Sequence, residues 1–501
     1  MSYDEIIKNF ISKEKSLIIA PAGYGKTHTI TECVKAIPDT DRVLILTHTH
    51  AGIASIKNKM INEKVDNKKF NIETITSYAQ KYVKSYCTDT LPDIEDSAIY
   101  WDFILEKVID VFNSSHIKKV IGSTYKHLFV DEYQDCNKKQ HSMILKLSEI
   151  LPTHILGDPL QGIIDFNDDL VNFEEDVIPI FGEPLELTTP YRWIKSGNSD
   201  LGDYIKDVRP LLEQNYINND SQKNNINLSL APQSAIEYIN TTIDTSDRKF
   251  HQEPFYKRTL ISKINSCEYN SLLVLVNKDM QPYERAYFIN NLGLSLSIKM
   301  LEAIDDKEFY KIAKQIDKII EEINKQQLTN IHKNIRENLW ERLFYSSELN
   351  KWFNDLGVKP KRQPNEILSL ELKLFYEEFL SNPNVNSIFK LLNFILKTIK
   401  IKPKRPSLIY TLISALNITD NNLSAYKAMT LQRNKIRKIG RKVDDKCIGT
   451  TLLTKGLEFD AVIIVDAHKF RCPKNLYVAI TRATKKLIIF SKGNILKPYQ
   501  D

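Results

Sequence analysis

Short runs of apolar residues recur through the first part of the chain, and polar or helical segments separate them. The clearest runs cover residues 17–19, 42–47 and 153–156. Continuous apolar runs of this length are typical of strands that are buried on both faces of a parallel sheet. Because loops and helical patterns lie between these runs, the sequence predicts an α/β fold.

Further apolar runs at residues 271–276, 461–465 and 486–490 predict a second parallel sheet. Between residues 301 and 443 the apolar positions take a helical period, so a helical insertion should interrupt this sheet. The positions with helical period include Phe309, Ile312, Ile316, Ile319, Ile320 and Ile323, and later Leu368, Leu370, Leu374, Phe375 and Phe379.

A chain of 501 residues is too long for a single core, so several domains are expected. The Asn-rich stretch 214–225 is typical of a linker and sets the first domain boundary. The expected division is a first α/β domain at 1–86 and 123–215, a small helical insertion at 87–122, a second α/β domain at 226–300 and 444–501, and a helical insertion at 301–443.

The amino-acid composition excludes few classes of protein. A hydrophobic content of 42% indicates a globular protein, and a net charge of +6 permits nucleic-acid binding without arguing for it. The six cysteines are scattered without metal-ligand spacing, as expected in a reducing compartment. The N-terminus does not resemble a signal peptide, and no run of about 18 apolar residues occurs. We therefore expect a cytoplasmic protein with no membrane segment.

The first apolar run leads into a loop of small residues at 20–27, Ala-Pro-Ala-Gly-Tyr-Gly-Lys-Thr. Its glycines allow backbone conformations that turn N–H groups onto phosphate oxygens. Lys26 can then reach the β- and γ-phosphates, and the Thr27 hydroxyl can bind Mg²⁺. The alternative is a chance strand–turn–helix with a solvated lysine, since Ala20 stands where the usual pattern has glycine. The predicted nucleotide contacts here are Ala22, Gly23, Tyr24, Gly25, Lys26, Thr27 and His28.

Two adjacent carboxylates, Asp131 and Glu132, end another apolar run. Packing alone does not explain them, because ionised groups are costly to desolvate. Asp131 is expected to hold Mg²⁺, usually through water, and Glu132 to orient and deprotonate the attacking water.

Two later motifs add groups that can contact phosphate or a base. Gln161 follows the run at 153–156, and its amide can sense a terminal phosphate. Tyr191 and Arg192 are neighbours, so a ring that can stack on a base lies beside a guanidinium that can contact phosphate.

In this order the motifs resemble those of the first motor domain of UvrD/Rep-type superfamily 1 helicases. Residues 448–460 and 475–483 resemble motifs V and VI of the same family. The resemblance implies two RecA-like P-loop NTPase domains with parallel sheets and helical insertions, which bind ATP and Mg²⁺ between them. It also implies ATP-dependent helicase or translocase activity on single-stranded DNA or duplex ends.

The resemblance assigns further roles at the nucleotide. Arg482 would be an arginine finger, and Arg192 would be a second arginine at the γ-phosphate. Gly456 and Glu458 would be contacts of motif V to the nucleotide, and Tyr191 would stack on the base. Two guanidiniums that close on the γ-phosphate would make hydrolysis depend on domain closure.

The chain departs from the family pattern at the positions where relatives recognise adenine and bind the DNA strand. Residues 3–16 contain no glutamine, so selectivity for adenine is not predicted. The positions that carry stacking aromatics in relatives are matched by His48 and Ile164, whereas Phe166 is retained and Asn167 replaces an arginine. A weak grip on the strand and poor unwinding by the isolated chain are therefore expected.

Three basic clusters lie in or beside the helical insertion, at 359–362, 400–405 and 433–442. The first is expected to be solvated surface. The third is the densest and directly precedes motif V, so we expect it to contact a nucleic-acid backbone.

In length, reduced insertions and its Asp-Glu-Tyr-Gln-Asp motif, the chain is similar to the helicase-like subunit of Gabija anti-phage defence systems. That resemblance implies a nuclease partner of the OLD type, which carries its own ATPase domain. A DNA-repair helicase would share the same motifs. A nucleotide-gated regulatory subunit that senses DNA without unwinding it is the contrasting class.

Overall fold

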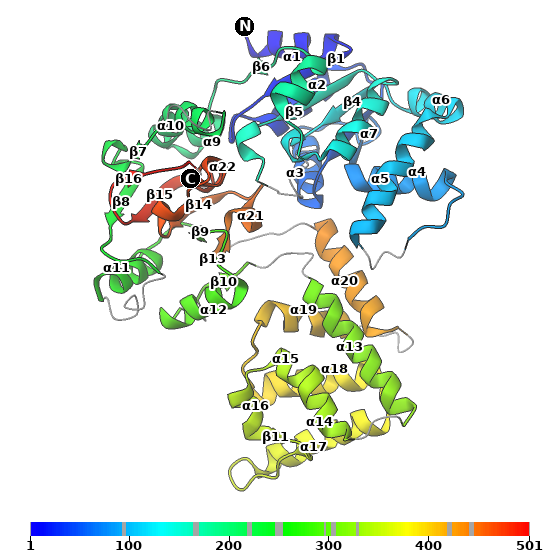
Figure 1. Cartoon of the computed structure of the whole chain (residues 1–501), viewed down its shortest axis with the longest axis vertical. Helices are drawn as coiled ribbons and strands as arrows, with labels where there is room; N and C mark the ends of the chain where they lie inside the picture. Colours follow the sequence, from blue (N-terminus) through cyan, green and yellow to red (C-terminus); the bar gives the residue numbers. More distant parts are fainter. Residues whose placement is uncertain are drawn as a thin grey trace. The chain divides into compact units, whose positions relative to one another are not determined.

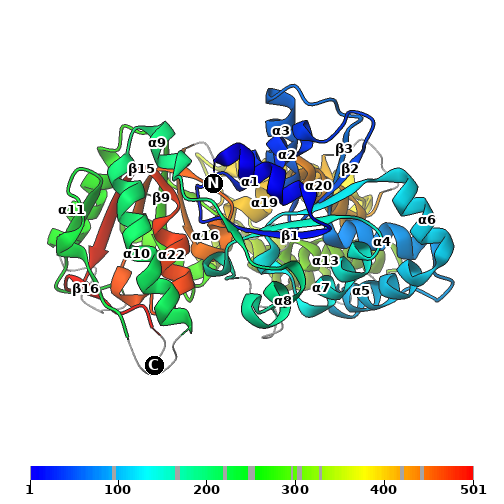
Figure 2. The same ribbon diagram turned by 90° about the horizontal axis from the view of Figure 1, so that it is seen from above.

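The computed structural model, shown in Figure 1 and Figure 2, divides into two compact units. Unit 1 comprises Met1–Leu301 with Lys442–Asp501, and unit 2 comprises Glu302–Arg441. Unit 1 contains both sheets and every residue of the predicted nucleotide site. The structure describes residues 2–92, 97–163, 170–217, 223–245, 254–294, 297–301, 307–326, 330–417, 423–439 and 445–499.

The first sheet has six parallel strands in the order β3-β2-β4-β5-β1-β6. β2 and β5 are buried along their whole length, which explains their continuous apolar character. Successive residues point to opposite faces, so Val43 and Ile45 join one core cluster whereas Leu44 and Leu46 join another. The strands are β1 Lys15–Ile19, β2 Val43–Thr47, β3 Phe70–Thr74, β4 His127–Val130, β5 Thr153–Gly157 and β6 Leu185–Glu186.

Helices cover both faces of this sheet. Buried residues of α1, α2 and α3 join the first cluster, and those of α4 to α8 join the second. α5 packs against α4 and α7, so the segment expected to be an insertion shares the core of the sheet. The helices are α1 Tyr3–Ser12, α2 Lys26–Ala36, α3 His50–Asn62, α4 Ile75–Tyr86, α5 Ser97–Asn113, α6 Ser115–Thr124, α7 Lys138–Ser148 and α8 Ile178–Phe181.

The second sheet also has six parallel strands, in the order β10-β13-β9-β14-β15-β8. Together the two sheets confirm the predicted α/β fold and are consistent with two RecA-like P-loop domains. The strands are β8 Ile236–Asn240, β9 Ser271–Val276, β10 Lys299–Met300, β13 Asp445–Thr450, β14 Phe459–Ile464 and β15 Ala483–Ser491, and β7 Ile226–Asn227 pairs antiparallel with β16 Ile495–Leu496. The helices around them are α11 Pro254–Asn265, α12 Pro282–Asn291, α21 Thr451–Thr454 and α22 Pro473–Ile480.

Helices α9 (Tyr191–Ser196) and α10 (Ser199–Ile217) pack against the second sheet, although the sequence placed residues 123–215 in the first domain. The buried indole of Trp193 donates from Nε1 to the Ala483 carbonyl at 2.9 Å. In both views α10 lies beside α22 (Figure 1, Figure 2). The expected linker at 214–225 begins inside α10, and its residues 218–222 lie outside the described residues.

Unit 2 is built mainly of helices around its own apolar core. Asp317 of α13 accepts hydrogen bonds from the Ala425 and Tyr426 N–H groups at the start of α20, at 2.6 and 2.9 Å. Its elements are α13 Lys307–Asn324, α14 Ile331–Ile335, α15 Glu341–Leu343, α16 Ser346–Trp352, α17 Glu366–Ser381, α18 Val385–Phe394, α19 Pro406–Leu416 and α20 Ala425–Ile439, with a hairpin of β11 Phe353–Asn354 and β12 Gly357–Val358.

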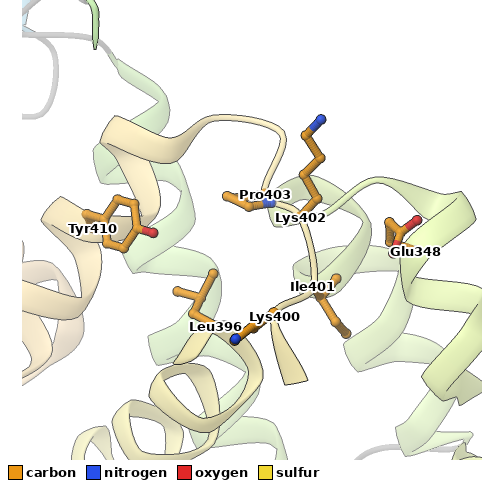
Figure 3. A pocket seen from close by; sticks show the side chains of 7 residues that line it. All are labelled: Glu348, Leu396, Lys400, Ile401, Lys402, Pro403 and Tyr410. Carbon is orange, nitrogen blue, oxygen red and sulfur yellow. The ribbon is translucent and has the colours of Figure 1, made fainter. Parts of the chain in front are cut away.

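The structure describes part of the basic clusters of unit 2. The Arg433 guanidinium lies 4.1 Å above the Phe309 ring and is 3% exposed. The prediction that this cluster contacts a nucleic-acid backbone is therefore wrong for Arg433, and the side chains after it lie outside the described residues. In the second cluster, Lys400 and Lys402 line a hollow of about 460 Å³ with Tyr410, but their ammonium groups point in different directions (Figure 3).

A buried polar chain links four elements of the first domain, α1, β1, β4 and β5. His154 of β5, which is fully buried, contacts Ser16 Oγ through Nδ1 at 2.8 Å and His127 Nδ1 through Nε2 at 3.0 Å. Ser16 in turn donates to the Phe10 carbonyl at 2.8 Å. Burial and the neighbouring His127 lower the pKa of His154 to about 3.

We expect His154 to make the protein less stable in mild acid. Its pKa is about 3 in the folded chain against an ordinary value of 6.5, so the unfolded chain binds more protons between these values. The contribution of neutral His154 to the free energy of unfolding is complete above pH 6.5. It falls as the pH is lowered, by about 2 kcal/mol at pH 5. Urea unfolding of wild type and His154→Gln at pH 5 to 8 tests this. The variant should lose less stability than wild type on acidification, and equal pH dependence would contradict the assignment.

Candidate nucleotide-binding site

The loop between β1 and α2 has the backbone of a phosphate cradle. Gly23 and Gly25 have φ values of +79° and +93°, in the region that favours glycine. A Cβ atom on Gly23 would lie 2.9 Å from the Arg192 Cβ and 2.9 Å from the Trp193 ring. The loop therefore needs glycine both for its conformation and for its close approach to α9.

Lys26 is the first residue of α2, where backbone N–H groups at the positive end of the helix are free to bind anions. Lys26 is 8% exposed, and its Nζ donates to the Ala20 carbonyl at 3.0 Å, which keeps the ammonium beside the loop. Thr27 is half-buried next to it. The Tyr24 ring packs in the core, so only the backbone of this residue is available to a nucleotide.

Asp131 and Glu132 lie at the carboxyl end of β4. Glu132 has φ 56° and ψ 43°, and its N–H donates to Asp131 Oδ1 at 3.0 Å. Burial and the Glu132 charge raise the pKa of Asp131, whereas Lys26 acts in the opposite direction. Although burial alone would raise it, Lys26 and Lys455 hold the pKa of Glu132 below its ordinary value. Glu132 is therefore ionised at neutral pH, as a general base must be.

A chain of hydrogen bonds through Gln134 and Asp158 connects Glu132 to the predicted sensor Gln161. Gln134 donates from Nε2 to Glu132 Oε2 at 2.5 Å, and its Oε1 accepts from the Asp158 N–H at 2.9 Å. Gln161 donates from Nε2 to Asp158 Oδ2 at 2.8 Å. Sequence reasoning assigned no role to Gln134, although its position two residues after Glu132 was a signal that it lies near the site.

Both predicted γ-phosphate arginines are bound to protein acceptors. Arg192 donates to the Thr481 carbonyl at 2.7 Å and pairs with Glu458 at 2.6 Å. Arg482 is 1% exposed and donates from Nε to the Val478 carbonyl at 3.0 Å. Burial and the nearby Arg192 lower the pKa of Arg482 to about 10, so it stays charged at neutral pH. Each guanidinium has five N–H donors and does not use all of them on these acceptors, and Arg192 Nε is buried without a hydrogen-bond partner among the described residues.

Lys455 joins the two halves of unit 1 and was not predicted as a site residue. Its ammonium pairs with the buried carboxylate of Asp135 and donates to the Gln161 carbonyl at 2.5 Å. Burial raises the pKa of Asp135 to about 6, and Lys455 opposes that rise. Lys455 directly precedes Gly456, which has φ +76°. The signal available in the sequence was a lysine inside a motif already assigned to the nucleotide.

Aromatic rings gather beside the cradle. Tyr3 stacks on His28 with ring centroids 5.9 Å apart and meets Tyr191 edge-on at 6.4 Å. A Cβ atom on Gly25 would lie 3.5 Å from the Tyr191 ring, so this ring is next to the phosphate loop. Burial lowers the pKa of His28, and it is therefore mainly neutral at pH 7. Tyr3 was not predicted as a site residue.

The predicted strand-binding positions are only partly described. His48 lies after β2, with Nε2 3.4 Å from the Cys136 sulfur, and burial lowers its pKa to about 3. This contact directs the imidazole toward the interior of the first domain. Ile164, Phe166 and Asn167 lie outside the described residues.

The oxygen donors near the cradle fit Mg²⁺. Thr27 offers a hydroxyl and Asp131 a carboxylate, both hard ligands of the kind that Mg²⁺ prefers. No group of three His, Cys, Asp or Glu that could hold a metal occurs among the described residues. The protein set would thus leave coordination positions to water and phosphate, which is the usual arrangement for Mg²⁺ at nucleotides.

Known proteins match this chain at both ends. Residues 4–167 match the model of an AAA domain, and residues 448–490 match that of a UvrD-like helicase C-terminal domain. A protein of Acanthamoeba polyphaga mimivirus, named as an ATP-dependent DNA helicase, is 26% identical over 212 residues. That match covers 39% of this chain and 28% of the viral protein. Across the described residues, none of the helices combines the length and the apolar character needed to span a membrane. Taken together, the three matches make the chain similar to an AAA domain and to a UvrD-like helicase C-terminal domain, and similar over part of its length to a protein named as a DNA helicase.

Proposed function

We propose that the chain hydrolyses ATP with Mg²⁺ and uses this reaction to move along, and locally open, single-stranded or end-containing DNA. The observation that carries the proposal is the assembly of one polar site from both sheets. The cradle, Glu132 and Gln161 come from the first sheet, and Arg192 pairs with Glu458 while Lys455 reaches Asp135.

Each residue has a proposed role in that reaction. Lys26 and the cradle hold the phosphates, while Thr27 and Asp131 hold Mg²⁺, which would offset phosphate charge. Glu132 takes the proton of the attacking water, and Gln161 senses the γ-phosphate.

Tyr191 stacks on the base, and the Arg192 and Arg482 guanidiniums stabilise charge in the transition state. Because both arginines belong to elements that pack on the second sheet, hydrolysis would be linked to how that sheet meets the cradle. Such a linkage is what a motor requires.

ATP hydrolysis by the purified chain should require Mg²⁺ and should be stimulated by single-stranded DNA. Strand displacement should be short, because His48 and Ile164 replace the stacking aromatics of relatives and each lost base–ring stack costs about 1–3 kcal/mol. We would measure phosphate release with and without a single strand, and displacement on duplexes of increasing length. Efficient unwinding of long duplexes by the chain alone would contradict the weak-grip proposal, and absence of ATP turnover would contradict the function.

A finer proposal is that the chain works in an anti-phage defence complex with an OLD-type nuclease. It is supported by the reduced insertions and the motif at residues 131–135. Co-purification of the chain with a nuclease encoded beside it would test this. A chain that purifies alone and acts in DNA repair would favour the repair helicase instead.

The competing function is a nucleotide-gated DNA sensor that hydrolyses ATP without unwinding. The sequence at residue 48 favours it, because His48 replaces an aromatic ring that stacks on a base in relatives. The strand-displacement measurement separates the two: DNA-stimulated turnover without any displacement would favour the sensor.

A further inference from the structure

The phenol of Tyr477 makes a contact that the proposed reaction does not use. Tyr477 lies on α22 and is fully buried, and its hydroxyl oxygen accepts from the Ala22 N–H of the cradle at 3.1 Å. Burial raises the pKa of this phenol, so it stays neutral. A residue of the second sheet's helix therefore holds the backbone of the phosphate loop.

Arg209 of α10 holds the same hydroxyl. It donates from Nη1 to Tyr477 Oη at 2.7 Å, and its guanidinium carbon lies 5.1 Å from the centre of the Tyr477 ring. Its Nη2 lies 2.8 Å from Asp158 Oδ1 and 2.7 Å from Glu213 Oε1. Burial alone would lower the pKa of Arg209, but Asp158 raises it, so the charge is retained.

Asp158 carries this chain of contacts into the candidate catalytic groups. It is fully buried, and its second carboxylate oxygen accepts from Gln161 Nε2 at 2.8 Å. Its N–H binds Gln134, which binds Glu132. The buried contacts thus run without interruption from the cradle through Tyr477 and Arg209 to the sensor and the base.

We infer that Tyr477 and Arg209 are positioning residues. They hold the cradle, Gln161 and Glu132 in fixed positions relative to α22. The inference rests on the proposed ATP hydrolysis. Arg482 lies just beyond the C-cap of α22, so one helix positions both the cradle and the arginine that must reach the phosphate. Buried polar groups in a low-dielectric interior tolerate little misplacement, and a lost partner changes the orientation of the next. The Tyr477 hydroxyl should therefore matter for turnover more than for nucleotide binding.

Tyr477→Phe keeps the ring and removes only the hydroxyl. We expect the kcat for ATP to fall by about 10- to 100-fold, the loss of one buried hydrogen bond to a charged group, while KM changes less than about threefold. Tyr256→Phe is the matched control, because it removes a buried hydroxyl of α11 that donates to Asp466, after β14, at 3.0 Å. Both variants should lose similar thermal stability, but only Tyr477→Phe should lose kcat.

A second pair of variants tests whether the effect passes through Arg209. Arg209→Lys keeps the charge. Its single ammonium cannot hold Tyr477 and Asp158 with the two separate nitrogens of a planar guanidinium. If the contacts act as one chain, the double variant with Tyr477→Phe should lose little more kcat than the worse single variant. A Tyr477→Phe protein with wild-type kcat, or an equal loss in Tyr256→Phe, would overturn the inference and leave the proposed function standing. A wild-type chain without turnover would overturn both.

Discussion

Arg482→Ala should lower the kcat for ATP hydrolysis by on the order of 10³, with little change in KM, as expected of an arginine that acts in the transition state. In the structure this guanidinium is buried and donates to the Val478 and Leu457 carbonyls, both at 3.0 Å. The same carbonyls lose a buried donor in the variant, so we expect a loss of about 1–3 kcal/mol in stability as well.

A matched control separates the two effects. Arg285 of α12 is also buried, at 4% exposure, and donates to the Met280 carbonyl at 2.6 Å, outside the candidate site. Arg285→Ala should lower Tm but leave kcat of the folded protein unchanged. Turnover by each variant is measured well below its Tm and divided by the folded fraction. An Arg482→Ala protein whose corrected kcat lies within tenfold of wild type would show that Arg482 is structural.

Glu132→Gln should abolish most turnover and leave nucleotide binding intact. Glutamine keeps the shape and the left-handed backbone of this position, but it cannot accept the proton of the attacking water. The loss of a general base lowers kcat by about 10²- to 10⁴-fold. Binding of a fluorescent ATP analogue and single-turnover hydrolysis measure the two steps separately.

Two further variants serve as controls for that result. Lys26→Ala should weaken binding of the analogue as well as turnover, because the ammonium beside the cradle is lost. Glu174→Gln, at an exposed carboxylate away from β4, should behave as wild type. Hydrolysis by Glu132→Gln at the wild-type rate would mean that another group activates the water.

The resting partners of the two arginines explain why hydrolysis should depend on conformation. Arg192 is held by Glu458 and by the Thr481 carbonyl, and its side chain is 13% exposed. A γ-phosphate is a stronger acceptor than a carbonyl and offers bidentate geometry. Transfer of Arg192 to phosphate would release Glu458 for the nucleotide, so the same exchange could complete both predicted contacts.

The sequence by itself determined the elements and the chemistry that is local to them. The continuous apolar runs at 42–47 and 271–276 form β2 and β9, because a strand buried on both faces needs apolar side chains at every position. The Gly-rich loop, with Lys26 as the first residue of α2, was also predictable, since positive φ values and a helix start are encoded within a few residues.

Other features were settled only by packing. Residues 123–215 were predicted to belong to the first domain. Within that range α9 and α10 also contact the second sheet, where the Trp193 indole finds its acceptor. Arg433 was expected at a nucleic acid, and the Phe309 ring instead covers it. A cluster of charges in sequence does not say which of its members lie inside a core.

The contacts that join the halves of the site depend on the tertiary structure alone. Lys455 meets Asp135, and Tyr477 meets both Arg209 and the cradle, across hundreds of residues of chain. Periodicity and motif spacing report only on neighbours within an element, whereas these pairs depend on how two sheets and their helices dock. Because a buried charge or hydroxyl is stable only with a partner, docking decides which polar residues can occupy those positions.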